Sequence, residues 1–189
     1  MRVTGGAARG VRLRSPKVAG VRPTTDRVRS ALFNILARHG LEGALVADLY
    51  AGTGSVGIEA LSRGAARADF VEADRRQAED IRFNVVAAKV VDRANVLRAD
   101  AEAAVERLEG PYDFVLMDPP YRQPFPSAVV ERIGTRGLLA EDAIVVVGHP
   151  SRVPPPGRCG GLTLSQDRRY GDSSLAFYEL IISASEATA

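Results

Sequence analysis

Four consecutive residues, Asp118-Pro119-Pro120-Tyr121, combine groups that could recognise a flat molecule bearing an exocyclic amino group. They directly follow an apolar run, residues 114–117, which is typical of a buried strand. The two prolines fix a rigid turn because each restricts its backbone torsion and lacks an N–H. In an open α/β sheet this turn would lie at the carboxyl end of a strand, where such sheets bind their ligands.

The chemistry of this Asp-Pro-Pro-Tyr motif follows from its functional groups. The Asp118 carboxylate and the Pro119 carbonyl can accept hydrogen bonds from an NH2 group, and the Tyr121 ring offers a stacking face. We therefore predict that Asp118, Pro119, Pro120 and Tyr121 form a catalytic site. An ordinary turn that ends a strand is the alternative, and the motif alone does not distinguish the two.

A second candidate site is a glycine-rich turn between a predicted strand and the helix that follows it. Gly52, Gly54 and Gly57 have the spacing of the dinucleotide-binding fingerprint, in which glycines let the backbone approach a ligand. Glu72 ends the next predicted strand, where a carboxylate can bind two ribose hydroxyls. Nicotinamide sites and S-adenosylmethionine sites share these features, so both cofactors must be considered.

Two acidic residues favour S-adenosylmethionine over a nicotinamide cofactor. Asp48 precedes the turn, where a carboxylate would repel a pyrophosphate but attract the ammonium group of a methionine moiety. Asp100 follows another predicted strand and could accept a hydrogen bond from an adenine amino group. An acid that only caps the loop is the alternative for Asp48. The predicted cofactor-binding residues are Asp48, Tyr50, Gly52, Gly54, Glu72, Asp100 and Ala101, and no metal site is expected.

The hydrophobic pattern predicts the elements that would position these residues. Strands are expected at 44–49, 68–72, 95–98, 113–117 and 143–147, and helices at 26–38, 55–63, 74–88, 101–109 and 125–133. After a proline- and glycine-rich loop at 150–161, residues 162–169 and 175–182 should form an antiparallel pair. This alternation predicts an α/β fold with a mostly parallel, doubly wound sheet that ends in the antiparallel pair.

The N-terminal segment, residues 1–24, is predicted to form a basic β-hairpin arm ahead of a domain at 25–183. Val and Leu alternate with Arg in this segment, and Gly5-Gly6 marks a turn. Strands of about seven residues would reach about 20 Å from the body of the protein.

Charge is distributed unevenly along the chain. Residues 1–40 contain eight Arg and Lys17 against one acid, Asp26, so their net charge is +8. Because the whole chain carries +2, the remainder carries −6. This asymmetry favours a polyanionic partner such as nucleic acid, although a solvated surface is the alternative. The predicted contacts are Arg9, Arg12, Arg14, Lys17, Arg22, Arg27 and Arg29.

Composition excludes several other classes of protein. The 189 residues suit one domain, and 46% hydrophobic and 25% charged residues are normal for a soluble protein. We expect neither a membrane span nor a signal peptide, because no apolar segment has the required length or position. Cys159 is the only cysteine, which excludes an internal disulfide and fits a reducing cytoplasm. His39 and His149 are expected to be surface or loop residues.

Several strings together resemble a known family. Residues 22–29 (Arg-Pro-Thr-Thr-Asp-Arg-Val-Arg), residues 31–36, Gly5-Gly6 and Tyr170-Gly171-Asp172-Ser173 look like the RsmD-type 16S ribosomal RNA guanine-N2 methyltransferases. The resemblance covers about residues 2–180 and implies a Rossmann-like class I methyltransferase that uses S-adenosylmethionine. Ser30 departs from the pattern, in which a Glu is expected.

The resemblance also implies a substrate and a partner. It implies methylation of a guanine N2 in the P-site loop of 16S rRNA, within the 30S subunit, by a monomer with an RNA-binding arm. A DNA adenine-N6 methyltransferase is an alternative because the Asp-Pro-Pro-Tyr motif suits both bases, although the chain leaves little room for a DNA-recognition domain. A non-catalytic ribosome-assembly factor that still binds S-adenosylmethionine is another alternative.

Overall fold

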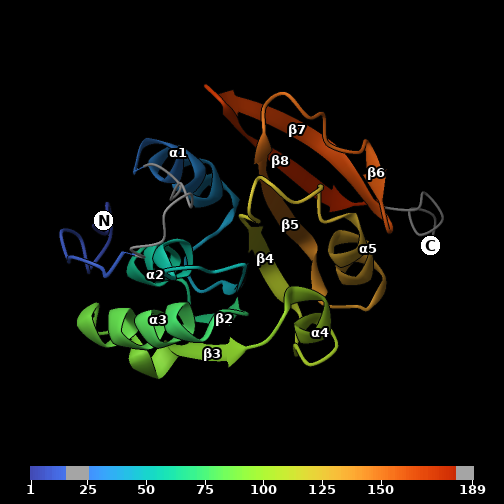
Figure 1. Cartoon of the computed structure of the whole chain (residues 1–189). Helices are drawn as coiled ribbons and strands as arrows, with labels where there is room; N and C mark the ends of the chain where they lie inside the picture. Colours follow the sequence, from blue (N-terminus) through green and yellow to red (C-terminus); the bar gives the residue numbers. More distant parts are fainter. Residues whose placement is uncertain (16–25, 182–189) are drawn as a thin grey trace.

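The computed structural model describes residues 1–15 and 26–181, and its central element is an eight-stranded sheet flanked by helices (Figure 1). The strands are β1 (Leu45–Leu49), β2 (Arg67–Glu72), β3 (Ala94–Arg98), β4 (Tyr112–Met117), β5 (Leu139–Pro150), β6 (Arg158–Cys159), β7 (Leu162–Tyr170) and β8 (Ser173–Leu180). The helices are α1 (Asp26–Leu36), α2 (Ser55–Ser62), α3 (Arg75–Ala87), α4 (Ala101–Val105) and α5 (Ser127–Thr135), with 3-10 turns at Ala37–His39 and Val91–Arg93.

The sheet has the strand order β3-β2-β1-β4-β5-β8-β7-β6. The pairs from β3 to β5 are parallel, whereas β5–β8, β8–β7 and β7–β6 are antiparallel. The chain therefore moves outward from β1 to β3 and then returns to place β4 on the other side of β1. This reversal creates a switch point between β1 and β4, where doubly wound sheets bind their ligands. The predicted sheet and its final antiparallel pair are confirmed.

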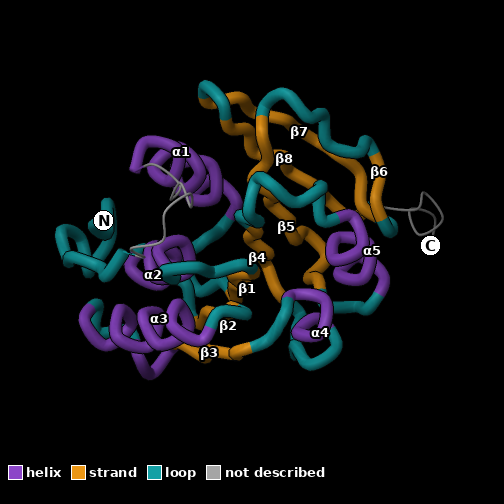
Figure 2. The backbone as a smooth tube through the Cα atoms, viewed as in Figure 1, coloured by secondary structure: helices purple, strands orange, loops and turns teal. Residues whose placement is uncertain are grey.

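Two hydrophobic cores lie on the two faces of the sheet. One core contains apolar residues of α1, α2 and α3, and the other contains apolar residues of α4 and α5. Figure 2 shows the same separation, with α1 to α3 on one side of the sheet and α4 and α5 on the other. The strands β1, β4 and β5 are buried along most of their length because helices cover both faces.

Some element boundaries differ from the prediction. Helix α4 ends at Val105 instead of residue 109, since the chain turns there, with Arg107 N donating to the Ala104 carbonyl, ahead of Gly110 and Pro111. Helix α5 begins at Ser127 because Pro126 disfavours a helical conformation at the preceding residue. Strand β5 is longer than predicted, and the short strand β6 lies within the predicted loop at 150–161.

The N-terminal residues form hairpin pairing, but the prediction that they project from the body is wrong. Arg2 and Arg12 form an antiparallel bridge, and Val3 N donates to the Val11 carbonyl at 3.1 Å. Val3 and Leu13 are 3% and 5% exposed, and they join the core that includes α2. The alternation of apolar and basic residues therefore buries one side of the hairpin against the protein and exposes the other.

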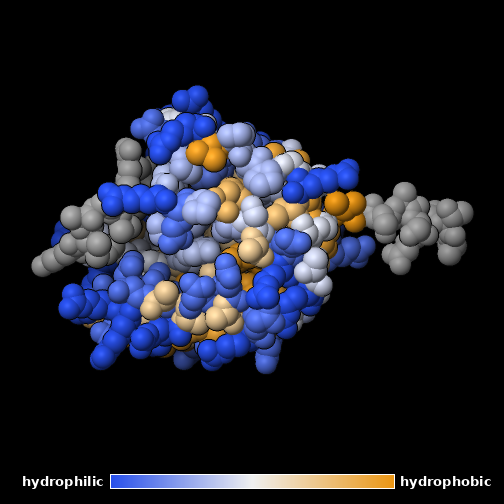
Figure 3. Space-filling view, turned by 45° about the vertical axis from the view of Figure 1, so that its right-hand side comes forward, coloured by the Kyte–Doolittle hydropathy of each residue, from blue (hydrophilic) through white to orange (hydrophobic). Residues whose placement is uncertain are grey.

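The surface in Figure 3 is mostly hydrophilic, and its hydrophobic residues form small, separate patches. Within residues 1–15 and 26–181, every helix is too short or too polar to cross a membrane.

Candidate active site

Three carboxylates lie at the carboxyl ends of three adjacent strands. Asp48 is in β1, Glu72 ends β2 and Asp118 directly follows β4. Strand register places Leu49 beside both Val71 and Met117, so Glu72 and Asp118 flank the chain at Tyr50. The structure thus brings together acids that lie 70 residues apart in the chain, at the switch point of the sheet.

Asp48 is the most deeply buried of these acids, with 3% of its surface exposed. Its Oδ2 accepts a hydrogen bond from Gly57 N at 2.8 Å, which is the loop-holding contact expected of a capping acid. The pKa of Asp48 is raised to about 7, mainly by burial and in part by the negative charges of Asp118 and Glu72, while the Gly57 hydrogen bond acts in the opposite direction. A cationic ligand beside this cluster would favour the ionised carboxylate.

The raised pKa of Asp48 predicts a specific dependence of stability on pH. Between pH 3.8 and about 7 the folded protein binds more protons than the unfolded chain, so its free energy of unfolding falls as pH rises through this window. Asp48→Asn keeps an oxygen for Gly57 N and removes the titration. We expect its free energy of unfolding relative to wild type to rise by a few kcal/mol between pH 4 and pH 8, measured by urea unfolding. Parallel pH curves for the two proteins would contradict this account.

The glycine-rich turn is held to the sheet by Glu72. Its Oε2 accepts from Gly52 N and its Oε1 accepts from Asp74 N, both at 2.8 Å. Each carboxylate oxygen has a second lone pair, so these contacts leave capacity for ligand hydroxyls. Gly57 is required by close packing, because a Cβ there would lie 2.4 Å from the Phe70 ring and 3.1 Å from Asp48 Oδ2.

Tyr50 connects β1 to the glycine-rich turn in a conformation that is rare for a residue with a side chain. Its φ is 61°, and strained torsions of this kind often occur at functional sites. Burial raises the pKa of Tyr50 to about 12, and the negative charges of Asp100 and Glu102 contribute. Asp100 therefore lies near the same turn, where it caps α4 by accepting from Glu102 N at 3.0 Å. The methyl group of Ala101 is buried in the core beneath.

The Asp-Pro-Pro-Tyr motif forms the turn after β4 as predicted. Pro119 is buried and Tyr121 is 37% exposed, while Gln123 N closes the turn on the Pro120 carbonyl at 2.9 Å. Residues of the motif line a cavity of about 90 Å³ that is bounded on its other side by the end of β5. The Tyr121 ring and the neighbouring Asp118 carboxylate therefore lie close together, at the carboxyl end of β4.

Gly148, Phe125 and His149 lie at this cavity but were not predicted from the sequence as site residues. Gly148 directly follows Val147, the β5 partner of Met117, and a Cβ there would lie 2.6 Å from Asp118 Oδ1. Phe125 lines the cavity and packs edge-on against His149, with ring centroids 6.2 Å apart. The signal for Gly148 was its position directly after the apolar run at 143–147, which is the strand end where ligands bind.

His149 is a buried residue, contrary to the prediction that it lies on the surface or in a loop. It is 3% exposed and belongs to β5. Its Nε2 lies 3.0 Å from Asp167 Oδ1, and its Nδ1 lies 3.0 Å from the Val153 carbonyl. These contacts join the cavity wall to β7. His39 is exposed, as expected.

The basic residues predicted to contact nucleic acid divide into two groups. Arg9, Arg12, Arg14 and Arg27 are exposed, while Lys17 and Arg22 lie outside the described residues. Arg29 is fully buried, so its assignment as a nucleic-acid contact is wrong. It pairs with Asp26 at 2.9 Å and with Glu59 at 3.4 Å, because α1 turns it inward toward α2.

The hairpin is connected to the glycine-rich turn through one buried side chain. Asn84 of α3 accepts from Arg14 N at 2.7 Å and donates to the Thr53 carbonyl at 2.9 Å. The predicted nucleic-acid segment and the predicted cofactor turn therefore share a hydrogen-bonding partner. Ser30, where the resemblance leads one to expect Glu, faces the hairpin too, since its hydroxyl lies 3.4 Å from that of Thr4.

Known proteins share both the sequence and this architecture. A family model described as "Conserved hypothetical protein 95" matches residues 1–179. Ribosomal RNA small subunit methyltransferase D of Escherichia coli (strain K12) is 37% identical over 95% of this chain and 89% of its own length. Bacillus subtilis YlbH, described as a candidate rRNA methyltransferase, is 32% identical over 95% of this chain and 98% of its own.

The solved structure of Escherichia coli yhhF, described as a candidate methyltransferase, superposes with a TM-score of 0.84 at 32% identity. It covers 95% of this chain and 97% of that one, so the predicted class I methyltransferase fold is confirmed. The match of the family model to nearly the whole chain and the identity to these relatives lead to one conclusion: the chain belongs to the RsmD family of methyltransferase-fold proteins.

Proposed function

We propose that this protein transfers a methyl group from S-adenosylmethionine to the exocyclic N2 of a guanine in the P-site loop of 16S rRNA, within the 30S subunit. The observation that carries this proposal is the Asp-Pro-Pro-Tyr turn, which lies one strand away from a carboxylate-lined glycine turn. The relative from Escherichia coli, named for methylation of small-subunit ribosomal RNA, supports the same substrate class. We propose further that the protein acts as a cytoplasmic monomer.

The residues at the switch point fit S-adenosylmethionine. Three carboxylates, Asp48, Glu72 and Asp118, interact electrostatically there, which suits a ligand with positive charges and opposes a pyrophosphate. Asp48 would hold the methionine ammonium, Glu72 the ribose hydroxyls, and Asp100 the adenine amino group. Tyr50, Gly52, Gly54 and Ala101 would contribute backbone surface to the same site. When bound, the cofactor supplies an electrophilic methyl group.

The residues that contact the guanine contribute to catalysis mainly by positioning it. The guanine must leave its stack to reach the site, at a cost of a few kcal/mol. Tyr121 stacks on the extruded base, while Asp118 and the Pro119 carbonyl accept hydrogen bonds from its amino group. These contacts direct the nitrogen lone pair toward the methyl group, and such orientation can lower a barrier by roughly 7–11 kcal/mol. Asp118 also offsets the positive charge that develops on the nitrogen.

The exposed side of the N-terminal hairpin supplies RNA contacts in this proposal. Arg9, Arg12 and Arg14 lie on that side, and Arg27 is exposed at the start of α1. Arginine side chains bind phosphates through charge and through hydrogen bonds. Because Asn84 ties Arg14 to the glycine turn, RNA bound at the hairpin would be held in a fixed position relative to the cofactor site.

Labelled S-adenosylmethionine tests this function directly. The protein is incubated with 30S subunits that lack the family methylation, with deproteinised 16S rRNA and with duplex DNA. We expect label in the 16S rRNA of the 30S subunit. Label in DNA alone would indicate the adenine-N6 alternative, and tight cofactor binding without transfer to any substrate would indicate a non-catalytic assembly factor.

A further inference from the structure

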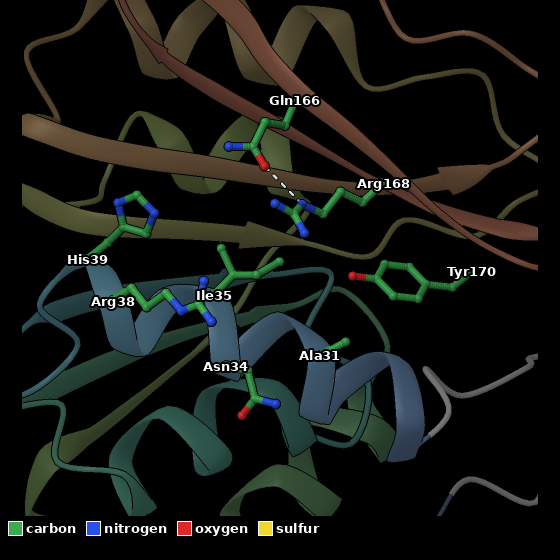
Figure 4. A pocket seen from close by; sticks show the side chains of 8 residues that line it. All are labelled: Ala31, Asn34, Ile35, Arg38, His39, Gln166, Arg168 and Tyr170. Carbon is green, nitrogen blue, oxygen red and sulfur yellow. Dashed lines mark hydrogen bonds between the residues drawn. The ribbon is translucent and has the colours of Figure 1, made fainter.

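A groove of about 380 Å³ lies between α1 and β7, outside the sites described above. Figure 4 shows Ile35 and Arg38 on the helix side and Gln166, Arg168 and Tyr170 on the strand side, and Asn34 of α1 lines the groove as well. Ile35 and Tyr170 are partly buried against the adjacent core and form its floor. The groove thus has an apolar floor with polar and charged side chains along its edges.

The charged side chains that line the groove are all basic. Arg38 lies in the 3-10 turn at Ala37–His39 that follows α1, and Arg168 lies on β7. Asp167, the neighbouring acid, belongs to the opposite face of β7, where it pairs with His149. Within residues 1–15 and 26–181, neither Arg38 nor Arg168 forms an ion pair. Two arginines are therefore available to an external anion.

Strand register connects the groove to the Asp-Pro-Pro-Tyr turn. Gly148 lies against Asp118 and pairs with Leu175 on β8, which in turn pairs with Arg168 on β7. Arg168 is thus three strands from Asp118 along one row, a distance of about 14 Å at the usual strand spacing. Tyr170 ends the groove at the same edge of the sheet as β5, where Ser151 N donates to the Asp172 carbonyl at 3.0 Å.

We propose that the groove between α1 and β7 binds the sugar–phosphate backbone of the RNA strand that carries the target base. Arg38 and Arg168 contact phosphates a few nucleotides from that base, and the phenol of Tyr170 and the amides of Asn34 and Gln166 contact sugar and phosphate oxygens. This inference rests on the proposed function and adds a second RNA surface, on a different part of the molecule from the N-terminal hairpin. RNA would then be held on both sides of α1.

Direct binding tests the groove separately from catalysis. The affinity for a fluorescent, unmodified 16S rRNA transcript is measured by anisotropy from 50 to 200 mM salt, for wild type and for the double variant Arg38→Ala/Arg168→Ala. If each arginine neutralises one phosphate of a single strand, the slope of log K against log salt becomes less steep by about 1.4, and affinity at the higher salt falls roughly ten-fold. The Lys/Lys double variant should restore the slope.

Arg107→Ala is the matched control because Arg107 is also exposed but lies just after α4, on the other face of the sheet. A groove variant with the affinity and salt slope of Arg107→Ala would overturn the proposal. The failure of the proposed function is distinguishable: wild type would then bind the transcript but methylate no guanine in 30S subunits, and the effect of the groove variant on binding would still decide this inference.

Discussion

Replacing Asp118 with alanine is expected to reduce methyl transfer by about 10²–10⁴-fold while leaving the affinity for S-adenosylmethionine within a few-fold of wild type. Asp118 follows β4 and lies against Gly148, next to the motif residues that line the small cavity. In the proposed mechanism its carboxylate is the acceptor that orients the amino group, and orientation is the largest contribution to catalysis. The proposed cofactor contacts come mainly from Asp48, Glu72 and the glycine turn.

The measurement is single-turnover transfer to 30S subunits, with cofactor affinity determined by calorimetry. Asp142→Ala serves as a control, because Asp142 is an exposed acid toward the other end of β5. Asp118→Asn keeps one acceptor oxygen and removes the charge, so it separates hydrogen bonding from charge stabilisation. Loss of cofactor binding in Asp118→Ala would place Asp118 in the cofactor site instead, and wild-type turnover would remove it from catalysis altogether.

The largest effect on stability is expected at Glu59, a fully buried residue of α2. Its carboxylate accepts from Thr4 N and Thr4 Oγ1 at 2.8 and 2.7 Å, pairs with Arg63 at 2.8 Å, and lies 3.4 Å from Arg29 Nε. Arg29 is itself buried, and its Nε and Nη1 lack a hydrogen bond among the described residues. Removing the carboxylate would take away the buried partner of this positive charge and leave it only the largely exposed Asp26 among the described residues.

Glu59→Ala should therefore lower the free energy of unfolding by about 3–5 kcal/mol, which corresponds to a fall in Tm of about 10 °C. Glu79→Ala is the matched control, because Glu79 also pairs with an arginine one helical turn away, at 2.9 Å, but both side chains are more than half exposed. An exposed pair of this kind contributes about 0.5 kcal/mol or less. Equal losses in urea unfolding for the two variants would contradict the role of buried charge.

The predicted site residues that the structure brings together were identified by rules that depend only on the local sequence. Asp118, Asp48 and Glu72 could be located because an apolar run marks a strand, and ligands of parallel sheets bind at strand ends. Pro119, Pro120 and the glycines mark turns through their own backbone properties, which do not depend on distant residues. For the same reason the succession of strands and helices along the chain could be derived from the sequence.

What could not be predicted depends on contacts between distant segments. Arg29 was predicted to contact nucleic acid because it lies in a basic segment. Its spacing from Phe33 and Leu36, however, places it on the buried face of α1. A charge count carries no information about burial, and only the packing of α2 provides Glu59 as its partner. The groove between α1 and Arg168 likewise exists because β7 is added to the sheet through β8, a long-range pairing that periodicity does not reveal.

Identification of the methylated nucleoside tests the central claim most directly. 30S subunits that lack the family methylation are incubated with labelled S-adenosylmethionine and the protein, and the 16S rRNA is digested to nucleosides and separated. The account predicts that the label is found in N2-methylguanosine, at a single position in the P-site loop. Label in N6-methyladenosine, or in any other nucleoside, would contradict the assignment of the guanine amino group as the acceptor.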